Sequence, residues 1–430
     1  MLHTATRSSD VAATIRRYGG GGPRRIAESA RRVIDHGEGS WLIDTEGRRI
    51  LDFATAMGVA AIGHAQPHWH ERVAVQAGRL AACVLHTREH AEYLDRLAAV
   101  MPDGVARVAL YSGGAEAVEV AIRLAQSLTG KRHLLSFSTA FHGKTAGTRY
   151  TGGRYADECG QLGVDWVHDV PFPVCTSHDA LAFNNCTDPG SAALPALDEA
   201  AARTDGVAAV IVEPVLGTAG NRPPERGFLA ALRAHCDARG WLLIVDESIT
   251  GFGRLGTNFA SQRFGVRPDI VILGKAMGGG YPLSGVAAGS DLWDRSLFAE
   301  MSSTSSSYGA NPLACVAGLA VLDIVEAPGF LDNVNAVATR LAAGLRDLEW
   351  DSPYVRGNRG VGMMLGYDLV DPATGDTATP ELCRELFTRS LDAGILTVGD
   401  VPHVRLNPPL VLSLEEADTA IAALRGSLVP

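Results

Sequence analysis

The sequence predicts an α/β protein, in which a large domain with a mostly parallel sheet flanked by helices is joined to a smaller α+β domain. Two observations support this prediction. From about residue 105, strand-like and helical segments alternate, which is typical of a parallel sheet. Some of these strands, such as 207–212, are near-continuous apolar runs, as expected where helices cover both faces of the sheet.

The first 60 residues are expected to form an N-terminal arm and part of the small domain. Residues 1–35 are basic and suggest a helical arm that the glycines at 19–22 interrupt. Residues 41–53 predict two short strands around a turn at Glu46 and Gly47, because strand-forming residues lie on both sides of a turn-forming pair.

The large domain is assigned to residues 61–320. A helix is predicted over Ala115–Leu128, since its apolar residues recur on one face. Residues 154–195 contain several Pro, Asn and Asp and predict a loop, either a plain surface excursion or an insertion near the mouth of a site. The other predicted elements are strands at 105–111, 134–137, 207–212, 242–246 and 270–273, and a helix at about 227–239.

The small domain is assigned to residues 321–430. A long helix at about 313–326 leads into it. We predict strands near 361–367 and 403–406 and a final helix near 414–426, which together make an α+β region.

Composition excludes several classes of protein. The net charge of -10 and pI of about 5.7 argue against a nucleic-acid partner, which needs a basic surface. The seven cysteines are scattered and form no C-x-x-C pair, which favours free thiols over disulfides or a zinc site. No apolar stretch approaches the roughly 18 residues of a membrane helix, and no signal peptide is evident. We therefore expect a cytoplasmic protein with no membrane or metal partner.

A lysine and an aspartate at the ends of two apolar runs suggest the chemistry. The chain has only three lysines, Lys131, Lys144 and Lys275. Lys275 follows one apolar run, and Asp246 ends another. A buried amine loses its proton easily and can form a Schiff base with an aldehyde, while a buried carboxylate needs a partner such as the N–H of a pyridine ring. A solvated lysine and a helix-capping aspartate remain the alternative.

Two further segments could bind the other parts of such a cofactor. Residues 112–117, Ser-Gly-Gly-Ala-Glu-Ala, lie between a predicted strand and helix, where backbone N–H groups and the helix N-terminus favour a phosphate. A tight packing turn is the alternative there. Phe141 could stack on a planar ring, unless it is a core residue beside a surface His142.

Arg405 lies within an apolar strand, a setting that suits bidentate binding of a carboxylate. It could equally belong to a structural ion pair. Glu213, which ends the strand at 207–212, could supply the other half of that pair.

Taken in their order, these motifs resemble the class III aminotransferases, the 4-aminobutyrate/ornithine/ω-amine group of fold-type I pyridoxal-phosphate enzymes. The resemblance covers about residues 37–425 and implies their fold, in which the mostly parallel sheet is mixed. The matching motifs are Gly63-His64-x-x-Pro67, Gly114-Ala115-Glu116-Ala117-Val118-Glu119, Phe141-His142-Gly143, Glu213-Pro214-Val215, Asp246 to Arg254, Gly274 to Gly280, Ser307 to Ala314, and Arg405-x-x-Pro408-Pro409-Leu410.

The resemblance implies a role for each motif toward pyridoxal 5'-phosphate. Lys275 would carry the Schiff base, and Asp246 would pair with the pyridine nitrogen. Phe141 would stack on the ring, and Gly114 and Ala115 would donate backbone N–H groups to the phosphate. The remaining cofactor-binding residues that it implies are His142 and Ile249.

It also implies partners. Ser307 would reach the phosphate of a neighbouring subunit, so we expect a homodimer with shared active sites. Met57, Glu213 and Arg405 would bind the substrates, a small-molecule amino donor and a keto or aldehyde acceptor. Arg405 would hold a carboxylate, and Glu213 would pair with Arg405 when the other substrate lacks one.

Three departures from the family pattern matter. Ala115 stands where Ser or Thr is usual, so a hydroxyl contact with phosphate is missing. Ile249 stands where many 4-aminobutyrate enzymes have Gln. Residues 85–90, which would face the substrate, lack the usual aromatic residue and are polar, which favours a polar or hydroxylated substrate.

The expected reaction is a ping-pong transamination. An amino donor displaces Lys275 from the cofactor, and the freed amine then moves a proton as general base and acid. The keto product leaves before a second carbonyl substrate takes up the amino group. The alternatives are an aminomutase or racemase, an amino-sugar transaminase, and a non-catalytic anion-binding module that uses the glycine-rich loops.

Overall fold

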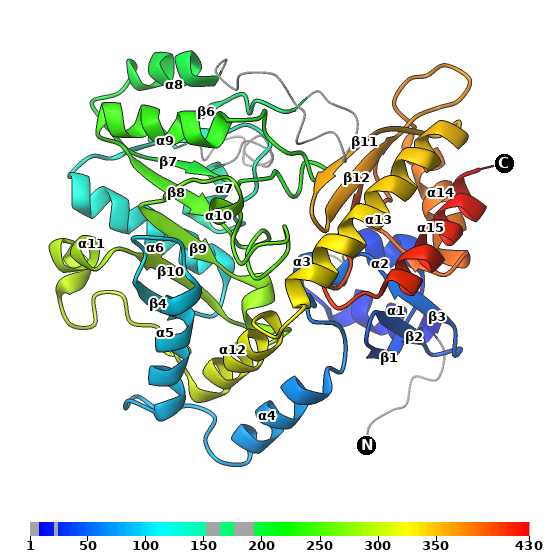
Figure 1. Ribbon diagram of the computed structural model, residues 1–430, viewed down its shortest axis with the longest axis horizontal. Coiled ribbons are helices and arrows are strands. Elements are labelled where there is room, and N and C mark those ends of the chain that lie inside the picture. Colours follow the sequence, from blue (N-terminus) through cyan, green and yellow to red (C-terminus); the bar gives the residue numbers. More distant parts are fainter. Residues whose placement is uncertain (1–7, 21–24, 152–163, 176–192, 430) are drawn as a thin grey trace.

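A seven-stranded sheet forms the centre of the molecule in the computed structural model, which describes residues 8–20, 25–151, 164–175 and 193–429 (Figure 1). Its strands are, in spatial order, β4 (Arg107–Tyr111), β10 (Ser284–Ala288), β9 (Ile270–Leu273), β8 (Leu242–Asp246), β7 (Val207–Val212), β5 (His133–Phe137) and β6 (Val167–Val170). The last five run parallel, whereas β10 is antiparallel to both of its neighbours. The prediction of a mixed, mostly parallel sheet is therefore confirmed.

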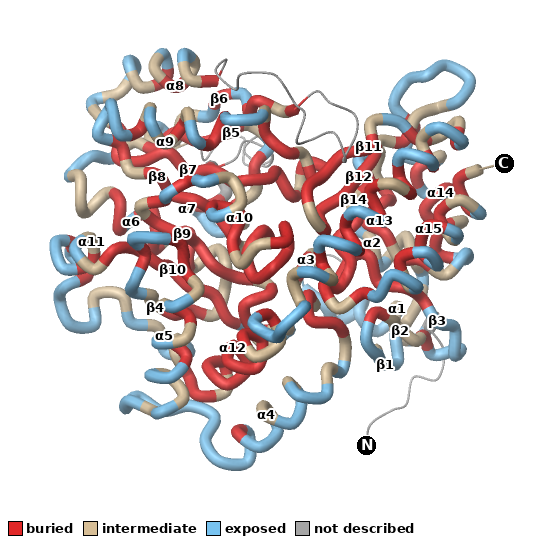
Figure 2. Tube along the Cα trace, in the orientation of Figure 1, coloured by how far each residue is buried: buried red, intermediate tan, exposed pale blue. Residues whose placement is uncertain are grey.

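Helices cover both faces of this sheet. Because alternate residues of a strand point to opposite faces, β8 places Ile244 in one hydrophobic core and Leu243 and Val245 in another. The first core includes α6 (Gly114–Thr129), and the second includes α8 (Ala193–Ala201) and α9 (Phe228–Arg239). Figure 2 shows the central strands buried along most of their length.

The C-terminal region, residues 330–429, packs against one side of the central sheet region (Figure 1). The buried helix α12 (Pro312–Val325) leads into it and packs against α4 (Pro67–Ala77) and α5 (Arg88–Val100). In the C-terminal region, helices cover a three-stranded antiparallel sheet. The strands are β11 (Val355–Val361), β12 (Met364–Leu369) and β14 (His403–Leu406), and the helices are α13 (Phe330–Asp351), α14 (Pro380–Asp392) and α15 (Leu414–Leu428).

The N-terminal segment joins this C-terminal region, and Figure 1 shows the blue and red parts of the chain side by side. Strand β3 (Arg49–Asp52) pairs in parallel with β13 (Ile395–Leu396) and extends through β2 (Trp41–Asp44) to β1 (Ile34–Glu38). Helices α1 (Ser8–Tyr18) and α2 (Arg25–Ala30) precede this sheet. The division of the chain into residues 1–60, 61–320 and 321–430 stays a prediction.

The remaining elements are short and connect the larger ones. They are α3 (Thr55–Gly58), α7 (Ala146–Tyr150), α10 (Ala260–Arg263), η3 (Lys275–Gly278), α11 (Ser290–Arg295) and η4 (Leu297–Ala299).

Three of the predicted elements differ from those in the structure. The strand predicted near 361–367 is a hairpin of β11 and β12, because Gly362 adopts a positive φ of 58° between them. The helical arm predicted over residues 1–35 is shorter in the structure, because β1 begins at Ile34 and is stabilised by its pairing with β2. Part of the predicted loop at 154–195 forms β6, paired with β5, and the start of α8, whereas 154–163 and 176–192 lie outside the described residues.

Across the residues that the structure describes, no helix by itself has the length and apolar composition to cross a membrane. The bent pair α12 and α13, with 71° between the two helices, meets these criteria when both are taken together.

Candidate active site

Lys275 and Asp246 lie at the same edge of the central sheet. Parallel strands place their carboxyl ends together, and the register of β8 with β9 puts Asp246 opposite Ile272. The chain leaves β9 through Gly274 and turns sharply at Lys275, whose φ is 46°. Both side chains line one cavity of about 380 Å³.

The cavity brings together residues from six segments of the chain. They are the ends of β8 and β9, the loops that follow β4, β5 and η3, and Val59 after α3. The lining residues are Val59, Ser112, Gly114, Ala115, Phe141, His142, Gly143, Asp246, Ser248, Gly274, Lys275, Gly280, Tyr281, Pro282 and Leu283.

Asp246 is ionised and oriented by its neighbours. Its Oδ2 lies 2.7 Å from His142 Nδ1, and its Oδ1 accepts a bond of 3.0 Å from Ser248 N. Burial raises the pKa of Asp246, but the bond from His142 and the charges of His142 and Lys275 outweigh it, so the pKa lies below its ordinary value. Burial lowers the pKa of His142, and the bond with Asp246 more than offsets this effect. Both shifts favour the charged forms of the pair, a carboxylate and an imidazolium.

The adjacent carboxylate, Glu247, has a different environment. It accepts backbone N–H bonds from Ala260 and Ser261, together with hydroxyl bonds from Ser261 and Thr250. Burial raises the pKa of Glu247 above its ordinary value. Glu247 thus fastens the chain at the start of α10, and only Asp246 of the two faces the cavity.

The surroundings of Lys275 favour its neutral amine form. Burial lowers the pKa of Lys275, the charges of Asp246 and Glu213 raise it, and those of Arg405 and Arg254 lower it further. The net pKa lies below the ordinary value for lysine. A lysine with a lowered pKa is neutral over a wider pH range, and the neutral amine is the form that attacks an aldehyde.

The opposite end of the cavity suits an anion. Gly114 and Ala115 begin the 16-residue helix α6, where N–H groups without helical partners carry a partial positive charge. A side chain added at Gly113 or Gly114 would meet no atom within 4 Å, so the backbone there faces open space. Because Ala115 has a methyl group and no hydroxyl, it could contact an anion only through its backbone N–H.

Phe141 lines the cavity beside His142 and is tied to Glu213. The N–H of Phe141 donates to Glu213 Oε1 at 2.8 Å, and Gly217 N donates to Glu213 Oε2 at 3.0 Å. Glu213 is buried, and this burial raises its pKa. Two backbone donors therefore fix the carboxylate close to the aromatic residue.

Met57 and Arg405 meet at the boundary between the central sheet region and the C-terminal region. Arg405 Nη2 lies 3.8 Å from Met57 Sδ. Thr55, Ala56 and Met57 form a turn in which their φ values are 42°, 48° and 65°, respectively. This conformation costs roughly 1 kcal/mol or more per residue. Thr55 Oγ1 donates to Asn407 O at 2.7 Å, which holds the strained turn against the strand of Arg405.

Several sequence-predicted positions lie outside the cavity lining, among them the three predicted substrate-binding residues Met57, Glu213 and Arg405. Ile249 is buried behind it, and a side chain added at Gly58 would come within 3.1 Å of Ile249 Cγ1. Ser307 is exposed on the surface of the chain. Residues 85–90 lie at the surface at the start of α5, where Thr87 caps the helix. Within one chain, neither Ser307 nor this stretch reaches the cavity.

Part of the lining was not predicted from the sequence. Val59, Ser248 and the wall of Tyr281, Pro282 and Leu283 were not selected. The glycines at 278–280 are the signal for that wall, because they turn the chain back after Lys275. Ser248 could have been inferred as the donor two residues after Asp246.

Comparisons with known proteins identify the fold and its chemistry. The family model described as aminotransferase class-III matches residues 25–428. Acetylornithine aminotransferase 1 of Bordetella pertussis is 34% identical over 397 residues, 90% of this chain and 93% of the relative. A 5-aminovalerate aminotransferase of Pseudomonas aeruginosa is 32% identical and covers 88% of each chain.

A solved structure extends the agreement to the whole fold. The PLP-bound amine transaminase from an uncultivated Pseudomonas species has a TM-score of 0.86 and 29% identity, covering 96% of this chain and 97% of that chain. The chain belongs to the class-III aminotransferase family of pyridoxal-phosphate-dependent enzymes.

Proposed function

We propose that this aminotransferase takes its amino group from a donor that carries a carboxylate at the end of its chain, such as an ω-amino acid. The observation that supports this proposal is the position of Arg405, whose charge acts on Lys275 from the boundary with the C-terminal region. The two curated relatives are named for acetylornithine and 5-aminovalerate, which both bear a carboxylate and an amine apart from each other.

The residues around the cavity fit pyridoxal phosphate. The start of α6 offers backbone N–H groups to the phosphate, and Phe141 offers an aromatic face to the ring. The carboxylate of Asp246 would accept the pyridine N–H, and Lys275 would bind the aldehyde carbon. When bound, the cofactor supplies an electron-accepting ring that stabilises the carbanion left when a proton leaves the amine-bearing carbon.

Lys275 would act twice in each half-reaction. Its amine would release the cofactor to the incoming amino group, and the freed Nζ would then take the proton from the amine-bearing carbon and deliver it to the former aldehyde carbon. The lowered pKa of Lys275 favours the neutral form of this nitrogen, the form that can accept a proton. His142 favours the charged form of Asp246, which would hold the proton on the ring nitrogen of a bound cofactor.

Glu213 and Arg405 would select the substrates. The guanidinium of Arg405 suits a carboxylate in a bidentate arrangement. Glu213 faces the same region and would compensate the charge of Arg405 when a substrate without a carboxylate is bound. Met57 contacts Arg405 and would line the path of the substrate chain.

We also propose a cytoplasmic homodimer that completes each site. Large apolar side chains are exposed on two segments of this chain, Val84 and Leu85 on one and Met301 and Tyr308 on the other. Ser307 adjoins Tyr308, so a partner covering this surface would receive its hydroxyl. The five cysteines within the described residues are free thiols, which suits a reducing compartment.

A half-reaction assay tests the proposed donor. The purified enzyme is mixed with 5-aminovalerate, N-acetylornithine or an amino sugar, and the loss of cofactor absorbance is followed before 2-oxoglutarate or pyruvate is added. We expect ω-amino acids to react fastest and the absorbance to recover only with a carbonyl acceptor. Fastest reaction with amino sugars would contradict the carboxylate donor, and rearrangement of the donor without any acceptor would indicate an isomerase.

A further inference from the structure

The segment from Glu213 to Arg222, here called the Glu213 hairpin, connects the active site to the C-terminal region. Leu216 and Arg222 exchange two backbone hydrogen bonds of 2.9 and 3.0 Å across it. Its turn contacts the site, because a side chain added at Gly217 would lie 3.3 Å from Glu213 Oε2 and 3.6 Å from Ile249 Cγ2. Any displacement of the hairpin would therefore move the Glu213 carboxylate.

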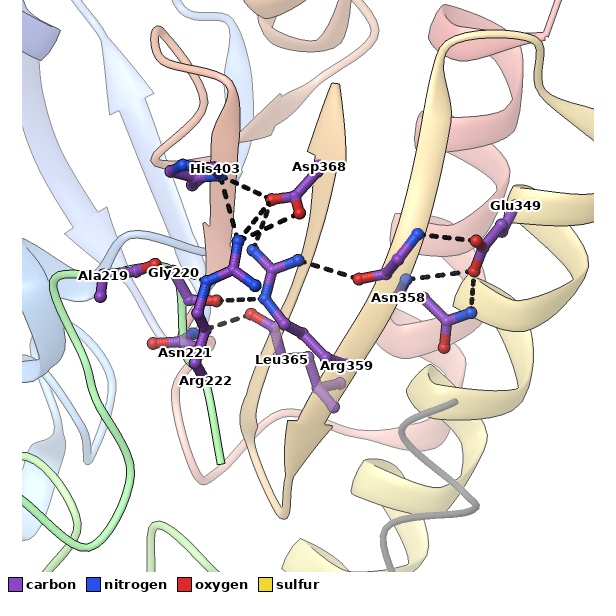
Figure 3. A network of polar contacts seen from close by, with 11 residues as sticks. Ala219, Gly220, Asn221, Arg222, Glu349, Asn358, Arg359, Leu365, Asp368 and His403 are labelled. Carbon is purple, nitrogen blue, oxygen red and sulfur yellow. Dashed lines mark hydrogen bonds and ion pairs between the residues drawn. The ribbon is translucent and has the colours of Figure 1, made fainter. Parts of the chain in front are cut away.

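Asp368 on β12 lies at the centre of a cluster with Arg222, Arg359 and His403, here called the Asp368 clamp (Figure 3). Arg222 Nη2 donates to Asp368 Oδ2 at 3.1 Å, and Arg359 Nη2 donates to Oδ1 at 2.8 Å. His403 Nδ1 lies 2.7 Å from Oδ1. One carboxylate thus holds together three basic side chains, of which Arg222 belongs to the hairpin and the others to the C-terminal region.

The C-terminal region also binds the hairpin through Gly220 and Asn221. Arg359 Nε donates to Gly220 O at 2.8 Å, and Asn221 Nδ2 donates to Leu365 O at 2.7 Å and to Asn407 Oδ1 at 2.9 Å. Gly220 has a φ of 111°, and a side chain there would come within 2.7 Å of Arg359 Nη2. Only glycine permits this approach.

The other side of the clamp is the strand that carries Arg405. In the register of β12 with β14, Asp368 is opposite His403, and Gly366 is opposite Arg405. A side chain added at Gly366 would lie 3.0 Å from Gly220 O, so the hairpin packs directly on the residue opposite Arg405. The clamp pair Asp368 and His403 therefore lies two residue pairs along β12 and β14 from the pair that contains Arg405.

We propose that the Asp368 clamp sets the relative position of Glu213 and Arg405, which makes Asp368 a positioning residue for carboxylate-bearing substrates. The inference rests on the proposed function, in which Arg405 binds the carboxylate. Asp368 lies outside the cavity that Lys275 lines, and it acts through the hairpin and β14.

Charge explains why one carboxylate can have this effect. Without it, the guanidinium groups of Arg222 and Arg359 would repel each other across the boundary between the hairpin and the C-terminal region. The hairpin and β14 would then move apart, which would loosen the carboxylate site. The cofactor end of the cavity belongs to β8, β9 and α6 and would keep its geometry.

Two amines with carbon chains of equal length distinguish an effect at the carboxylate-binding end of the site from an effect at the cofactor end. 5-Aminovalerate and n-pentylamine share the reacting amine, but only the first has a carboxylate. In Asp368→Asn we expect the KM for 5-aminovalerate to rise about tenfold, with kcat and the KM for n-pentylamine changing less than about twofold. If n-pentylamine does not react, its inhibition constant replaces KM. Asp368→Glu should restore most of the loss.

Asp418→Asn is the matched control, since Asp418 forms an exposed ion pair with Arg340 in the same region. A thermal melt and cofactor loading check the fold of each variant, and Arg222→Gln replaces Asp368→Asn if the latter does not fold. Equal changes for both amines, or no change for 5-aminovalerate, would overturn the positioning role. Arg405→Met separates the two proposals: if it leaves the KM for 5-aminovalerate unchanged, the carboxylate-binding function itself fails.

Discussion

Asp246 and Asp368 are two carboxylates with lowered pKa values in two regions of the molecule, and their surroundings differ. Asp246 ends a central strand and has one basic hydrogen-bond partner, His142, with its remaining side facing the cavity. Asp368 lies in the C-terminal sheet, and three basic groups contact it. Burial raises the pKa of Asp368, but the bond with His403 and the charges of Arg359 and Arg222 bring it to about 2.

The two carboxylates differ in whether they can accept a hydrogen bond from a further donor. A carboxylate that already has three basic side chains as partners serves to hold them together. A buried carboxylate with one cation and an open side can accept a further donor, and the pyridine N–H fits that position. A lowered pKa therefore does not by itself identify a functional group, and the unfilled side of Asp246 does.

Removing each charge should give effects of very different size. Asp246→Asn should lower kcat/KM about 1,000-fold for every amine, because the ring nitrogen loses the charge that stabilises it in the transition state. Asp368→Asn should lower it about tenfold and only for donors with a carboxylate. Steady-state kinetics with 5-aminovalerate and n-pentylamine measure both variants, and similar losses in both would contradict the distinction drawn between them.

The role of His142 can be tested through pH. In His142→Phe, burial of Asp246 is no longer opposed by an imidazolium, so the pKa of Asp246 should rise. The carboxylate would then take up a proton at a higher pH, and activity would fall roughly tenfold at about pH 6 relative to the optimum. A pH–rate profile that keeps the acid limb of the unmodified enzyme would show that His142 does not maintain the charge.

The smallest effect concerns stability. The pKa of Asp368 is lowered from 3.8 to about 2, so its contribution is fully present above 3.8 and is lost as pH falls toward 2. Asp368→Asn should therefore lower the free energy of unfolding by roughly 2 kcal/mol at neutral pH. Denaturant unfolding at a series of pH values should show this difference shrinking in acid. Asp418→Asn should cost less than about 0.5 kcal/mol.

The sequence predicted the central sheet well, because its strands are apolar runs and its helices have one apolar face. β7 and β8 begin and end where the apolar runs do. The strands with weaker patterns were missed. β10 contains glycine and alanine, and its place in the sheet depends on pairing with β4 and β9, which are distant in sequence.

The same reasoning applies to the site. Lys275 and Asp246 were selected because each follows a buried strand, and the structure places both at one cavity. The bond between Asp246 and His142 joins residues 104 positions apart, so local patterns do not reveal it. The Asp368 clamp left no signal at all, since its members come from three separate segments.

The attachment of the cofactor to Lys275 is the claim on which the rest depends, and the scarcity of lysine makes it directly testable. Reduction of the loaded enzyme with borohydride fixes the cofactor to its lysine, and peptide mass spectrometry locates the adduct among the three lysines of the chain. We expect a phosphopyridoxyl group on the peptide that contains Lys275 and on no other. An adduct on Lys131 or Lys144, with Lys275 unmodified, would contradict the account.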